Sequence, residues 1–549
     1  MNPRTRVLGL VTAFAGACEP LYAQTVPPAV LPGRIEQDIK KEPVPAPREE
    51  FIRIDRSRFA EQMPSGASDT RLVLSAITLH GNSVISSAEL QALWAPLVGR
   101  QVSLADVFRV AARISAVYRE RGYVLSQAIV PQQDLQAAGA TVRIEVLEGY
   151  IEGVSFVGID ERRLRDFFAP VLAEKPLRLA TLERSLLLVN ELAGVTVQAN
   201  LKAGLLPNAS SLVVVASSTP PAYSLSAHNR STPAQGRLRI EAALDFPGPL
   251  QRFDRHSLRL ISSGDERLNF LGYGFEAPLG AQGLKFQLNA SASRSKPTSA
   301  LGNIDTKSDN LGLGLSYPIL RSRQSNLAAR VNLAGYNNSS DSALTTASST
   351  DRIRALRIGV AADYADRVSG ISMLDAEFSK GLSVLGAASA EPDTLADPQF
   401  TKMSLYLARL QHLGGEWSLL FAVTAQHSSD PLPSAEQLGL GGDTFLRAYD
   451  PSEVIGENGA AAKAELRYNF SARSVLATLY GYVDGGSVRR KQALGPDLKN
   501  TLTAAGFGVR VSGHSRFKGY LELAKPIRQV VASRGNKDVR LFGGIGTDF

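Results

Sequence analysis

Short segments of alternating apolar and polar residues fill the chain from about Pro221 to its final residue, Phe549. A period of two with charges on one side is typical of strands that contact lipid on one face and a wet lumen on the other. In hydrocarbon every backbone polar group needs an internal partner, so strands can cross a membrane only as a closed barrel. The pattern therefore predicts a transmembrane β-barrel. A large soluble β-sandwich also alternates, and it is the competing interpretation.

The number of segments favours the barrel. Sixteen candidate strands begin near Tyr223, Arg237, His256, Leu268, Leu284, Asn310, Asn326, Arg352, Gly370, Phe400, Trp417, Ala460, Val475, Leu502, Phe517 and Val539. An even number of antiparallel strands, at roughly 20 residues per strand and connection, is typical of bacterial barrels. The last strand alternates through Leu541, Ile545 and Phe549. We therefore predict a barrel of 16 antiparallel strands over residues 220–549.

The strand predicted over Ala460–Phe470 shows the two faces most clearly. Its apolar face carries Ala464, Leu466, Tyr468 and Phe470, and its polar face carries Lys463, Glu465, Arg467 and Asn469. We expect the charged face to line the lumen of the barrel.

The composition agrees with a barrel and excludes several other classes of protein. The 549 residues have a mean hydropathy of −0.05, as expected when half of each strand is polar. The net charge is +8, but Lys and Arg are dispersed rather than clustered, so we predict no nucleic-acid partner. The six His show no metal-ligand spacing, and the chain has no phosphate-binding loop or nucleophile motif. We therefore predict no catalytic residues, no cofactor and no metal site, and hence no enzyme.

The amino terminus has the features of a secretory signal. Arg4 and Arg6 precede the apolar stretch Val7–Ala17, which is too short to span a bilayer. We expect a signal peptide of residues 1–23, with cleavage at the end of the apolar stretch as the alternative. Removal of residues 1–23 would take away Cys18, the single cysteine, and would exclude thiol catalysis. A lipid-modified Cys18 is the other interpretation, but the leucine expected before such a cysteine is missing.

Residues 24–70 form a Pro-rich, polar tract, which is typical of a linker that does not pack a core. Within this linker the segment Gly33–Lys41 has no proline, and Ile35 and Ile39 lie four residues apart on one helical face. A short helix and a disordered stretch are both compatible with this segment, because propensity alone does not hold so short a helix.

Two small α+β modules are predicted between the linker and the barrel, at residues 71–149 and 150–219. Both follow the order strand, helix, helix, strand, strand. In the first module Ser86 and Glu89 have capping-box spacing before the first helix. Apolar residues at helical spacing predict the second helix over about Leu104–Arg121. In the second module the predicted segments are Val154–Val157, Glu161–Val171, Leu182–Leu192, Val195–Leu201 and Ser211–Val215.

Two such modules before a barrel resemble the transporters of two-partner secretion, the TpsB family, and the modules resemble POTRA domains. Ile77–Ser83 is similar to that family's opening strand and turn, and Arg119–Ser126 is similar to its helix-to-strand junction. The most specific resemblance lies between the eleventh and twelfth predicted strands, in a loop of about residues 436–459. There Leu440–Tyr449 is similar to the V-R-G-F/Y motif of the wider barrel-assembly superfamily.

This resemblance implies roles for individual residues. In the superfamily the loop folds back into the lumen, and its arginine contacts an acidic residue of the inner wall. Arg447 is the corresponding arginine, and Tyr482–Gly486 matches the family's F-x-D-x-G pattern, so Asp484 is the implied partner. A guanidinium group fits a carboxylate with two parallel hydrogen bonds. The remaining implied motif residues are Gly441, Gly442, Leu446, Ala448 and Tyr449 in the loop, and Tyr482 and Gly486 in the strand.

Simpler interpretations exist for each of these residues. Asp484–Gly486 is also compatible with a hairpin turn, and Arg447 with a solvated loop residue. Ala448 stands where the family usually has glycine. If that position takes a positive φ, the alanine would be strained by about 1 kcal/mol.

The resemblance implies an outer-membrane transporter with its amino-terminal modules in the periplasm. Such a protein recognises an unfolded partner exoprotein through its POTRA domains and passes it through the barrel pore to the cell surface. The other implied partners are outer-membrane lipid and the barrel assembly machinery, which would read the carboxy-terminal strand and Phe549. A monomer is expected, and the helix around Ile35 and Ile39 would plug the pore. The alternative is an insertase for outer-membrane barrels, which shares the loop motif but usually carries more POTRA domains.

Overall fold

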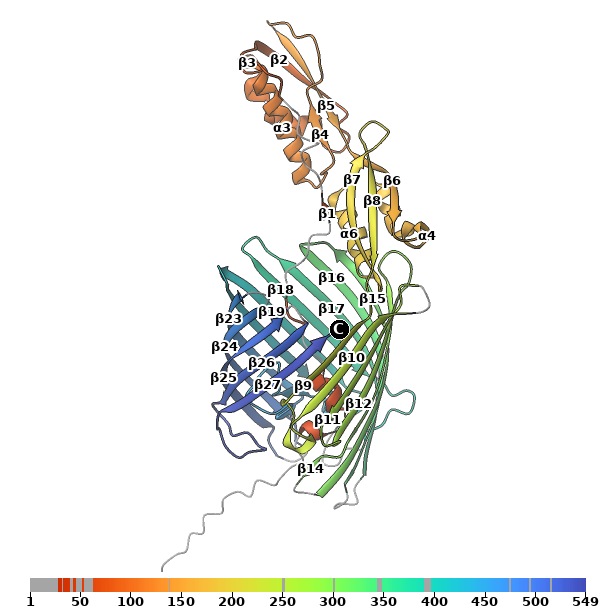
Figure 1. Ribbon diagram of the computed structural model, residues 1–549, viewed down its shortest axis with the longest axis vertical. Coiled ribbons are helices and arrows are strands. Elements are labelled where there is room, and N and C mark those ends of the chain that lie inside the picture. The colour runs from red at the N-terminus through yellow and green to blue at the C-terminus, as the bar shows by residue number, and fades with distance from the viewer. Residues whose placement is uncertain are drawn as a thin grey trace, which may run out of the picture.

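The computed structural model describes residues 28–31, 33–39, 43–45, 52–53, 63–137, 139–248, 252–299, 302–342, 348–389, 396–472, 475–492, 495–513 and 516–549. The predicted signal peptide, with Cys18, and much of the Pro-rich linker lie outside the described residues. Two small sheet modules stand in a row at one end of a large barrel (Figure 1).

The first module is a four-stranded sheet with helices on one face. Its elements are β2 (Arg71–His80), α2 (Ser87–Leu90), β3 (Gln101–Ser103), α3 (Leu104–Glu120), β4 (Gln127–Ile129) and β5 (Ala140–Leu147). The sheet order is β3-β2-β5-β4, with β2 and β5 parallel. The helix α3 buries Val107, Val110 and Ile114 in the core, the face that the helical spacing predicted.

Helix capping in this module differs from the prediction. Ser86 accepts a hydrogen bond from the Glu89 N–H at 3.3 Å, but the Glu89 carboxylate pairs with Arg121 instead of completing the capping box. A complete capping box begins α3, where Ser103 and Asp106 each accept a backbone N–H of the other. The short strand β3, which ends at this Ser103, was not predicted because three residues carry no alternation signal.

The second module repeats the arrangement beside the barrel. Its elements are β6 (Tyr150–Val157), α4 (Glu161–Leu164), α5 (Ala169–Ala173), α6 (Leu179–Asn190), β7 (Val195–Ala203) and β8 (Ala209–Ser218). The sheet order is β1-β7-β8-β6, and β1 (Ile52–Arg53) comes from the Pro-rich linker and pairs parallel with β7. The helix predicted over Glu161–Val171 is broken into shorter turns, because Pro170 can begin a helix but cannot continue one.

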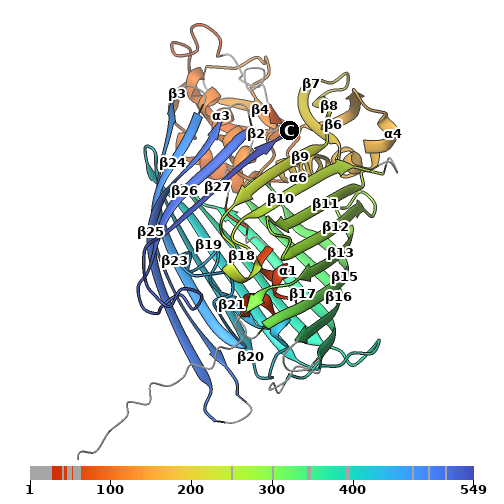
Figure 2. The same ribbon diagram turned by 60° about the horizontal axis from the view of Figure 1, so that its bottom comes forward.

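A closed antiparallel barrel of 16 main strands follows, counted among the described residues, and it confirms the predicted fold class (Figures 1 and 2). Its strands are β9 (Ala222–His228), β10 (Arg239–Pro247), β11 (Arg255–Ser263), β12 (Leu268–Pro278), β13 (Lys285–Ser295), β15 (Gly302–Arg321), β16 (Ser325–Ser342), β17 (Ser348–Ala365), β18 (Gly370–Gly381), β19 (Thr401–Gly414), β20 (Trp417–Ser428), β23 (Asn458–Ala472), β24 (Val475–Arg490), β25 (Leu498–Gly513), β26 (Phe517–Pro526) and β27 (Arg540–Asp548). The two-residue strand β14 (Thr298–Ser299) pairs with the start of β15.

The faces of the strands are those that the alternation predicted. On β23 the charged residues Lys463 and Glu465 are buried inside, whereas Leu466 and Phe470 are exposed on the outer surface. Most strands begin within two residues of the predicted position. The strands β15, β17 and β25 begin earlier than predicted, because their first residues are mostly polar on both faces and lack the alternation of a lipid-facing segment.

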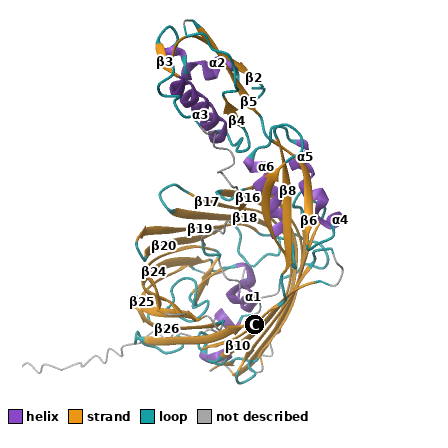
Figure 3. Cartoon of the chain, turned by 45° about the horizontal axis from the view of Figure 1, so that its top comes forward, coloured by secondary structure: helices purple, strands orange, loops and turns teal. Residues whose placement is uncertain are grey.

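The lumen contains two further segments. The helix α1 (Arg34–Ile39) lies inside the ring of strands, as Figure 3 shows from the side of the modules. The connection between β20 and β23 also folds inward, and it contains the short antiparallel pair β21 (Leu438–Leu440) and β22 (Val454–Gly456). A cavity of about 1030 Å³ lies between α1, this loop and the inner wall. Among the described residues, no helix has the length and apolar character needed to cross a membrane.

Candidate functional site

The inward loop reverses direction at a tight tip, which two glycines make possible. Gly441 and Gly442 follow β21 with φ values of +119° and +109°, a conformation that side-chain-bearing residues rarely adopt. A Cβ atom on Gly441 would lie 2.1 Å from the carbonyl oxygen of Asp450, so the two arms of the loop approach too closely for any other residue. These glycines therefore set the course of the loop tip that carries Arg447.

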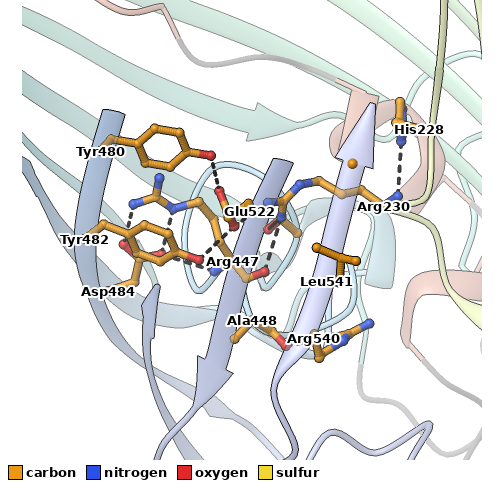
Figure 4. Close-up of polar contacts among 12 residues, drawn as sticks. His228, Arg230, Arg447, Ala448, Tyr480, Tyr482, Asp484, Glu522, Arg540 and Leu541 are labelled. Carbon is orange, nitrogen blue, oxygen red and sulfur yellow. Dashed lines mark hydrogen bonds and ion pairs between the residues drawn. The ribbon is translucent and has the colours of Figure 1, made fainter. Parts of the chain in front are cut away.

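The Arg447 side chain is buried against the inner wall of the barrel (Figure 4). Its Nε and Nη2 atoms donate to the two carboxylate oxygens of Asp484, each at 3.0 Å, and its backbone N–H donates to the same group at 3.1 Å. A further nitrogen, Nη1, pairs with Glu465 of β23. The guanidinium group lies 3.4 Å from the ring centroid of Tyr482. We call the Arg447–Asp484 contact the loop lock.

Asp484 lies in the middle of β24 and points into the lumen with Tyr482, while Val483 between them is exposed on the outside. The hairpin-turn interpretation of Asp484–Gly486 is therefore wrong, and so is the interpretation of Arg447 as a solvated residue. A buried charge is costly unless it is paired, and this arginine meets two carboxylates. The structure thus brings together the two residues that the sequence motifs singled out.

Glu465 was not predicted as part of the lock. It accepts hydrogen bonds from Arg467 and Arg510, both at 2.8 Å, in addition to its pair with Arg447. The alternation on its strand placed it correctly in the lumen, but the choice of partner depends on the register between β23 and β24, where Glu465 lies opposite Tyr482. No short sequence motif identifies a carboxylate such as Glu465, which is shared by three arginines.

The other motif residues of the loop support the tip. Ala448 does not have a positive φ, so the strain considered for an alanine there does not arise, and Leu446 takes the left-handed conformation instead, with φ of 58°. Tyr449 donates its hydroxyl to the carbonyl oxygens of Thr503 and Gln529 at 3.2 and 3.1 Å. On the wall, a Cβ atom at Gly486 would lie 3.0 Å from Leu440, so glycine lets β21 lie close to the strand.

A second buried ion cluster holds the base of the loop, and it was not predicted. Glu436 accepts hydrogen bonds from Arg357 of β17 at 2.5 and 3.2 Å. Its carboxylate also lies 2.5 Å from the ammonium group of Lys402 on β19, which donates to the Glu436 carbonyl oxygen at 3.0 Å. The inward loop is thus attached to the wall by ionic contacts at its base and at its tip.

The helix α1 contacts both the wall and the loop. Ile35 and Ile39 pack against Ile261, Leu268 and Phe270 of β11 and β12. Arg34 is 1 % exposed and donates to the loop carbonyl oxygens of Ser434 and Gln437, at 3.2 and 2.6 Å. Arg34 also donates to the hydroxyl of Ser452 at 2.6 Å, and that hydroxyl donates to Asp38 at 2.7 Å. Within the described part of the segment, Ile35 and Ile39 therefore lie on the barrel wall and Arg34 and Asp38 contact the loop, while Glu36 accepts a hydrogen bond from Ser293 of the wall at 3.3 Å.

A closed barrel with an inward-folded loop and two preceding α+β modules defines a class of outer-membrane transporters. The family model of the haemolysin secretion/activation proteins ShlB/FhaC/HecB matches residues 209–511, which is more than half of the chain. The model of the ShlB-type POTRA domain matches residues 72–149. The chain therefore belongs to the haemolysin secretion/activation family, the transporters of two-partner secretion.

Relatives and solved structures agree with this assignment. The outer membrane transporter CdiB of Escherichia coli O6:K15:H31 is 25 % identical over 82 % of this chain and 78 % of its own length. The heme/hemopexin transporter HuxB of Haemophilus influenzae is 22 % identical over 81 % of this chain and 82 % of its own length. The solved structure of CdiB from Escherichia coli superposes with a TM-score of 0.72, at 22 % identity, over 89 % of this chain and 93 % of that chain.

These findings place the barrel in the outer membrane and the POTRA region in the periplasm. The relatives are named as transporters and not as enzymes. Transporters of this family work with secreted exoprotein partners. The family assignment does not favour the insertase alternative.

Proposed function

We propose that this protein recognises one unfolded exoprotein in the periplasm through its POTRA modules and translocates it through the barrel to the cell surface. The observation that carries this proposal is the content of the lumen. The strand wall is closed, and α1 and the inward loop, both attached by side-chain contacts, occupy the space inside it. A passage for an extended chain therefore opens only when one or both of these segments move.

Recognition would use the edges of the POTRA sheets. An unfolded chain offers unpaired backbone groups, and adding a strand to a sheet edge binds such a chain with little dependence on its sequence. In the first module β3 and β4 are the outer strands of the sheet. In the second module β6 is the outer strand on one side, and on the other side β1 from the linker pairs with β7. Side-chain contacts beside the edge strand would add selectivity for one exoprotein.

The resting state would be closed by α1, and the loop lock would fix the loop in the position that transport requires. Arg34 supports the plugging role, because a cation with no more than 1 % exposure is held by three loop acceptors. The loop lock supports the second role, because it joins the inward loop to the barrel wall through an ion pair with two parallel hydrogen bonds.

Residues exposed on the outside of the barrel support the remaining proposed partners. Apolar side chains such as Val483, Phe507 and Leu521 are exposed on the outside of the barrel and would contact outer-membrane lipid. Phe549 is exposed at the end of the last strand, where the barrel assembly machinery would read it. The described strands close into a ring, so among them no strand of the wall leaves a whole edge for pairing with a second copy, which supports a monomer.

The test compares culture supernatants of a parent strain and a strain lacking this protein by mass spectrometry, with outer-membrane fractions alongside. We expect one large protein to vanish from the supernatant while other outer-membrane barrels keep their levels. Loss of several barrels from the membrane would instead identify an insertase and would refute the proposal.

A further inference from the structure

The first and last strands of the barrel meet along a short seam. Five residue pairs join β9 to β27, from Ser224–Asp548 to His228–Gly544, whereas nine pairs join β10 to β11. Beyond β9, Asn229 continues the contact through a bond from its N–H to the Gly543 carbonyl oxygen at 3.2 Å. The strand β27 extends past this point to Arg540, where no residue of β9 lies opposite it in the described ladder.

Arg230 holds the loop tip from one side of this seam (Figure 4). It lies two residues beyond β9, and its guanidinium group donates to the carbonyl oxygens of Gly442 and Arg447 at 3.3 and 3.2 Å. It also pairs with Glu522 of β26 and lies 4.3 Å from the ring centroid of Phe542 on β27. The group is buried, so these contacts replace its hydration.

Arg540 holds the loop tip from the other side. It is the first residue of β27, and its guanidinium group donates to the carbonyl oxygen of Ala448 at 2.8 Å and pairs with Asp450. It lies 4.8 Å from the same Phe542 ring. Successive carbonyl groups of the loop, those of Arg447 and Ala448, are therefore bound by arginines from opposite sides of the seam.

The seam contacts and the loop lock form one closed cycle. Arg447 stacks on Tyr482, and the Tyr482 hydroxyl donates to Glu522 at 2.8 Å. Glu522 pairs with Arg230, which donates back to the Arg447 carbonyl oxygen. The side chain and the backbone N–H of Arg447 are thus bound by the wall, and its carbonyl oxygen is bound by Arg230 at the first-strand side of the seam.

We propose that Arg230 and Arg540 are positioning residues that, with the loop tip, form a seam clamp at the end of the β9–β27 junction where the strand ladder stops. The Asn229 side chain accepts from the Gly543 N–H at 2.9 Å and donates to the Leu541 carbonyl oxygen at 3.1 Å at this end, and the two arginines add the loop tip to the junction from the lumen side. Charge-assisted hydrogen bonds are the strong class of such bonds, so separating the two strands requires breaking them. Release of the loop tip and loosening of the seam are then one event. This inference requires no passenger and goes beyond the proposed function.

The test uses the full-length protein in outer-membrane vesicles. The double variant Arg230→Met/Arg540→Met should unfold at a lower temperature than the parent, measured by the change in electrophoretic mobility when the folded barrel opens. A disulfide across the seam, Ala227→Cys/Ile545→Cys at paired positions, should then restore the unfolding temperature. The bridge introduces the two cysteines into a mature chain expected to contain none, because the single natural cysteine lies in the predicted signal peptide.

Matched controls distinguish an effect at the seam from a general change in barrel stability. A disulfide between β23 and β24, Tyr468→Cys/Leu479→Cys at paired positions, should not restore the double variant. The control arginine is Arg330 of β16. It donates two hydrogen bonds to Asp375, both at 2.7 Å, and neither residue belongs to the loop or to the seam strands. Any decrease in unfolding temperature caused by Arg330→Met should not be reversed by the seam disulfide.

Equal restoration by both disulfides, or none by the seam disulfide, would overturn the proposal. Should the double variant not assemble, Arg230→Lys is measured in the same way. Lysine keeps the charge but has a single nitrogen, whereas in Arg230 one nitrogen reaches the two loop carbonyl groups and a second pairs with Glu522. Its unfolding temperature should fall and should be restored by the seam disulfide alone; an unchanged temperature contradicts the clamp.

Discussion

At the scale of single residues, the lumen is organised by arginines whose partners are supplied by other elements. Arg447 comes from the loop, Asp484 from β24 and Glu465 from β23. Breaking such a buried pair by removing one partner costs about 3–5 kcal/mol, because the other charge is left unpaired. We expect this loss of free energy to weaken the attachment of the loop and not the pairing of the barrel strands, because backbone hydrogen bonds hold the strands together.

Arg447→Ala should therefore leave the barrel assembled while export of the exoprotein falls sharply. The alanine removes the arginine that pairs with Asp484 and one of the three arginines that pair with Glu465, so the loop tip loses about 3–5 kcal/mol of its attachment. The measurements are the amount of exoprotein in the supernatant and the heat-dependent mobility of the barrel.

Two variants control for this effect. Arg447→Lys keeps the charge without the two-pronged geometry and should give an intermediate export level. Arg489→Ala removes an exposed arginine near the end of the same strand as Asp484 and should export normally. Unchanged export by Arg447→Ala would contradict the role proposed for the loop lock.

A carboxylate in the first POTRA module makes a pH-dependent contribution to stability. Glu148 accepts hydrogen bonds from the Ser83 and Val84 N–H groups at 2.7 and 3.1 Å and from the Tyr118 hydroxyl at 2.8 Å. Burial opposes its ionisation, but these bonds, led by that from the Ser83 side chain, outweigh burial and hold the pKa of Glu148 below its usual 4.5. A depressed folded-state pKa means stability that is present above 4.5 and is lost as the pH falls through the folded value.

Glu148→Gln should accordingly lower the unfolding temperature of a purified fragment of residues 69–219 at neutral pH, and the difference from the parent should narrow as the pH falls below 4.5. Thermal unfolding followed by circular dichroism measures both effects. Glu145→Gln is the matched control, because its pair with Arg143 at 3.4 Å is exposed and worth little. A difference between Glu148→Gln and parent that stays constant with pH would contradict this assignment.

At the scale of elements, the sequence predicted the features that recur along the chain, such as the strands and their faces. It did not predict contacts between residues that are distant in sequence. Alternation identified the strand number and the lumen face of β23, since both follow from lipid on one side of the wall. The early starts of β15 and β25 were missed because polar residues on both faces carry no such signal. Arg447 and Asp484 were found through motifs, whereas Glu436 with Arg357 joins elements far apart in sequence and left no local pattern.

The helix α1 has six residues and therefore depends on its contacts, because so short a helix is not stable alone. Deletion of residues 24–68 should raise the single-channel conductance of the barrel in planar bilayers, since the helix leaves the lumen. Arg34→Ala should raise the conductance in part, because it removes the donor to Ser434, Gln437 and Ser452 but leaves Ile35 and Ile39 packed on the wall.

The control for the plug is Arg143→Ala, an exposed arginine in the first POTRA module, which should conduct like the parent. Equal conductance of the parent and the deletion variant would show that α1 does not limit the pore.

At the scale of the whole molecule, the second module is fastened to the barrel by polar contacts at its rim. Arg184 of α6 donates to the carbonyl oxygens of Pro318 and Ile319 in β15, at 2.9 and 3.5 Å, and to that of Gln282 in the connection between β12 and β13, at 3.3 Å. Glu191, at the end of the same helix, lies 3.2 Å from the Lys285 ammonium group and also pairs with Arg321. These contacts join α6 of the second module to the barrel rim.

The double variant Arg184→Ala/Glu191→Ala should loosen this attachment without unfolding either part. Each half-buried ion pair of Glu191 contributes about 1 kcal/mol, but Arg184 and Glu191 together contact five barrel residues, so their joint loss should be measurable. Limited proteolysis should cut the connection between β8 and β9 several-fold faster than in the parent, while the barrel keeps its unfolding temperature. Export should fall, because a module that turns freely no longer delivers a bound chain to the pore.

The matched control is Glu161→Ala, which removes a carboxylate of the same module whose pair with Arg165 at 3.9 Å is exposed. This variant should be cleaved between β8 and β9 at the same rate as the parent, and it should export the same amount of exoprotein. If the double variant is cut faster but exports normally, the fixed direction of the module is not needed for transport, and delivery depends on the flexible reach of the POTRA pair instead. If cutting is unchanged, the apolar contacts of Phe253 with the module core, and not the ion pairs, hold the two parts together.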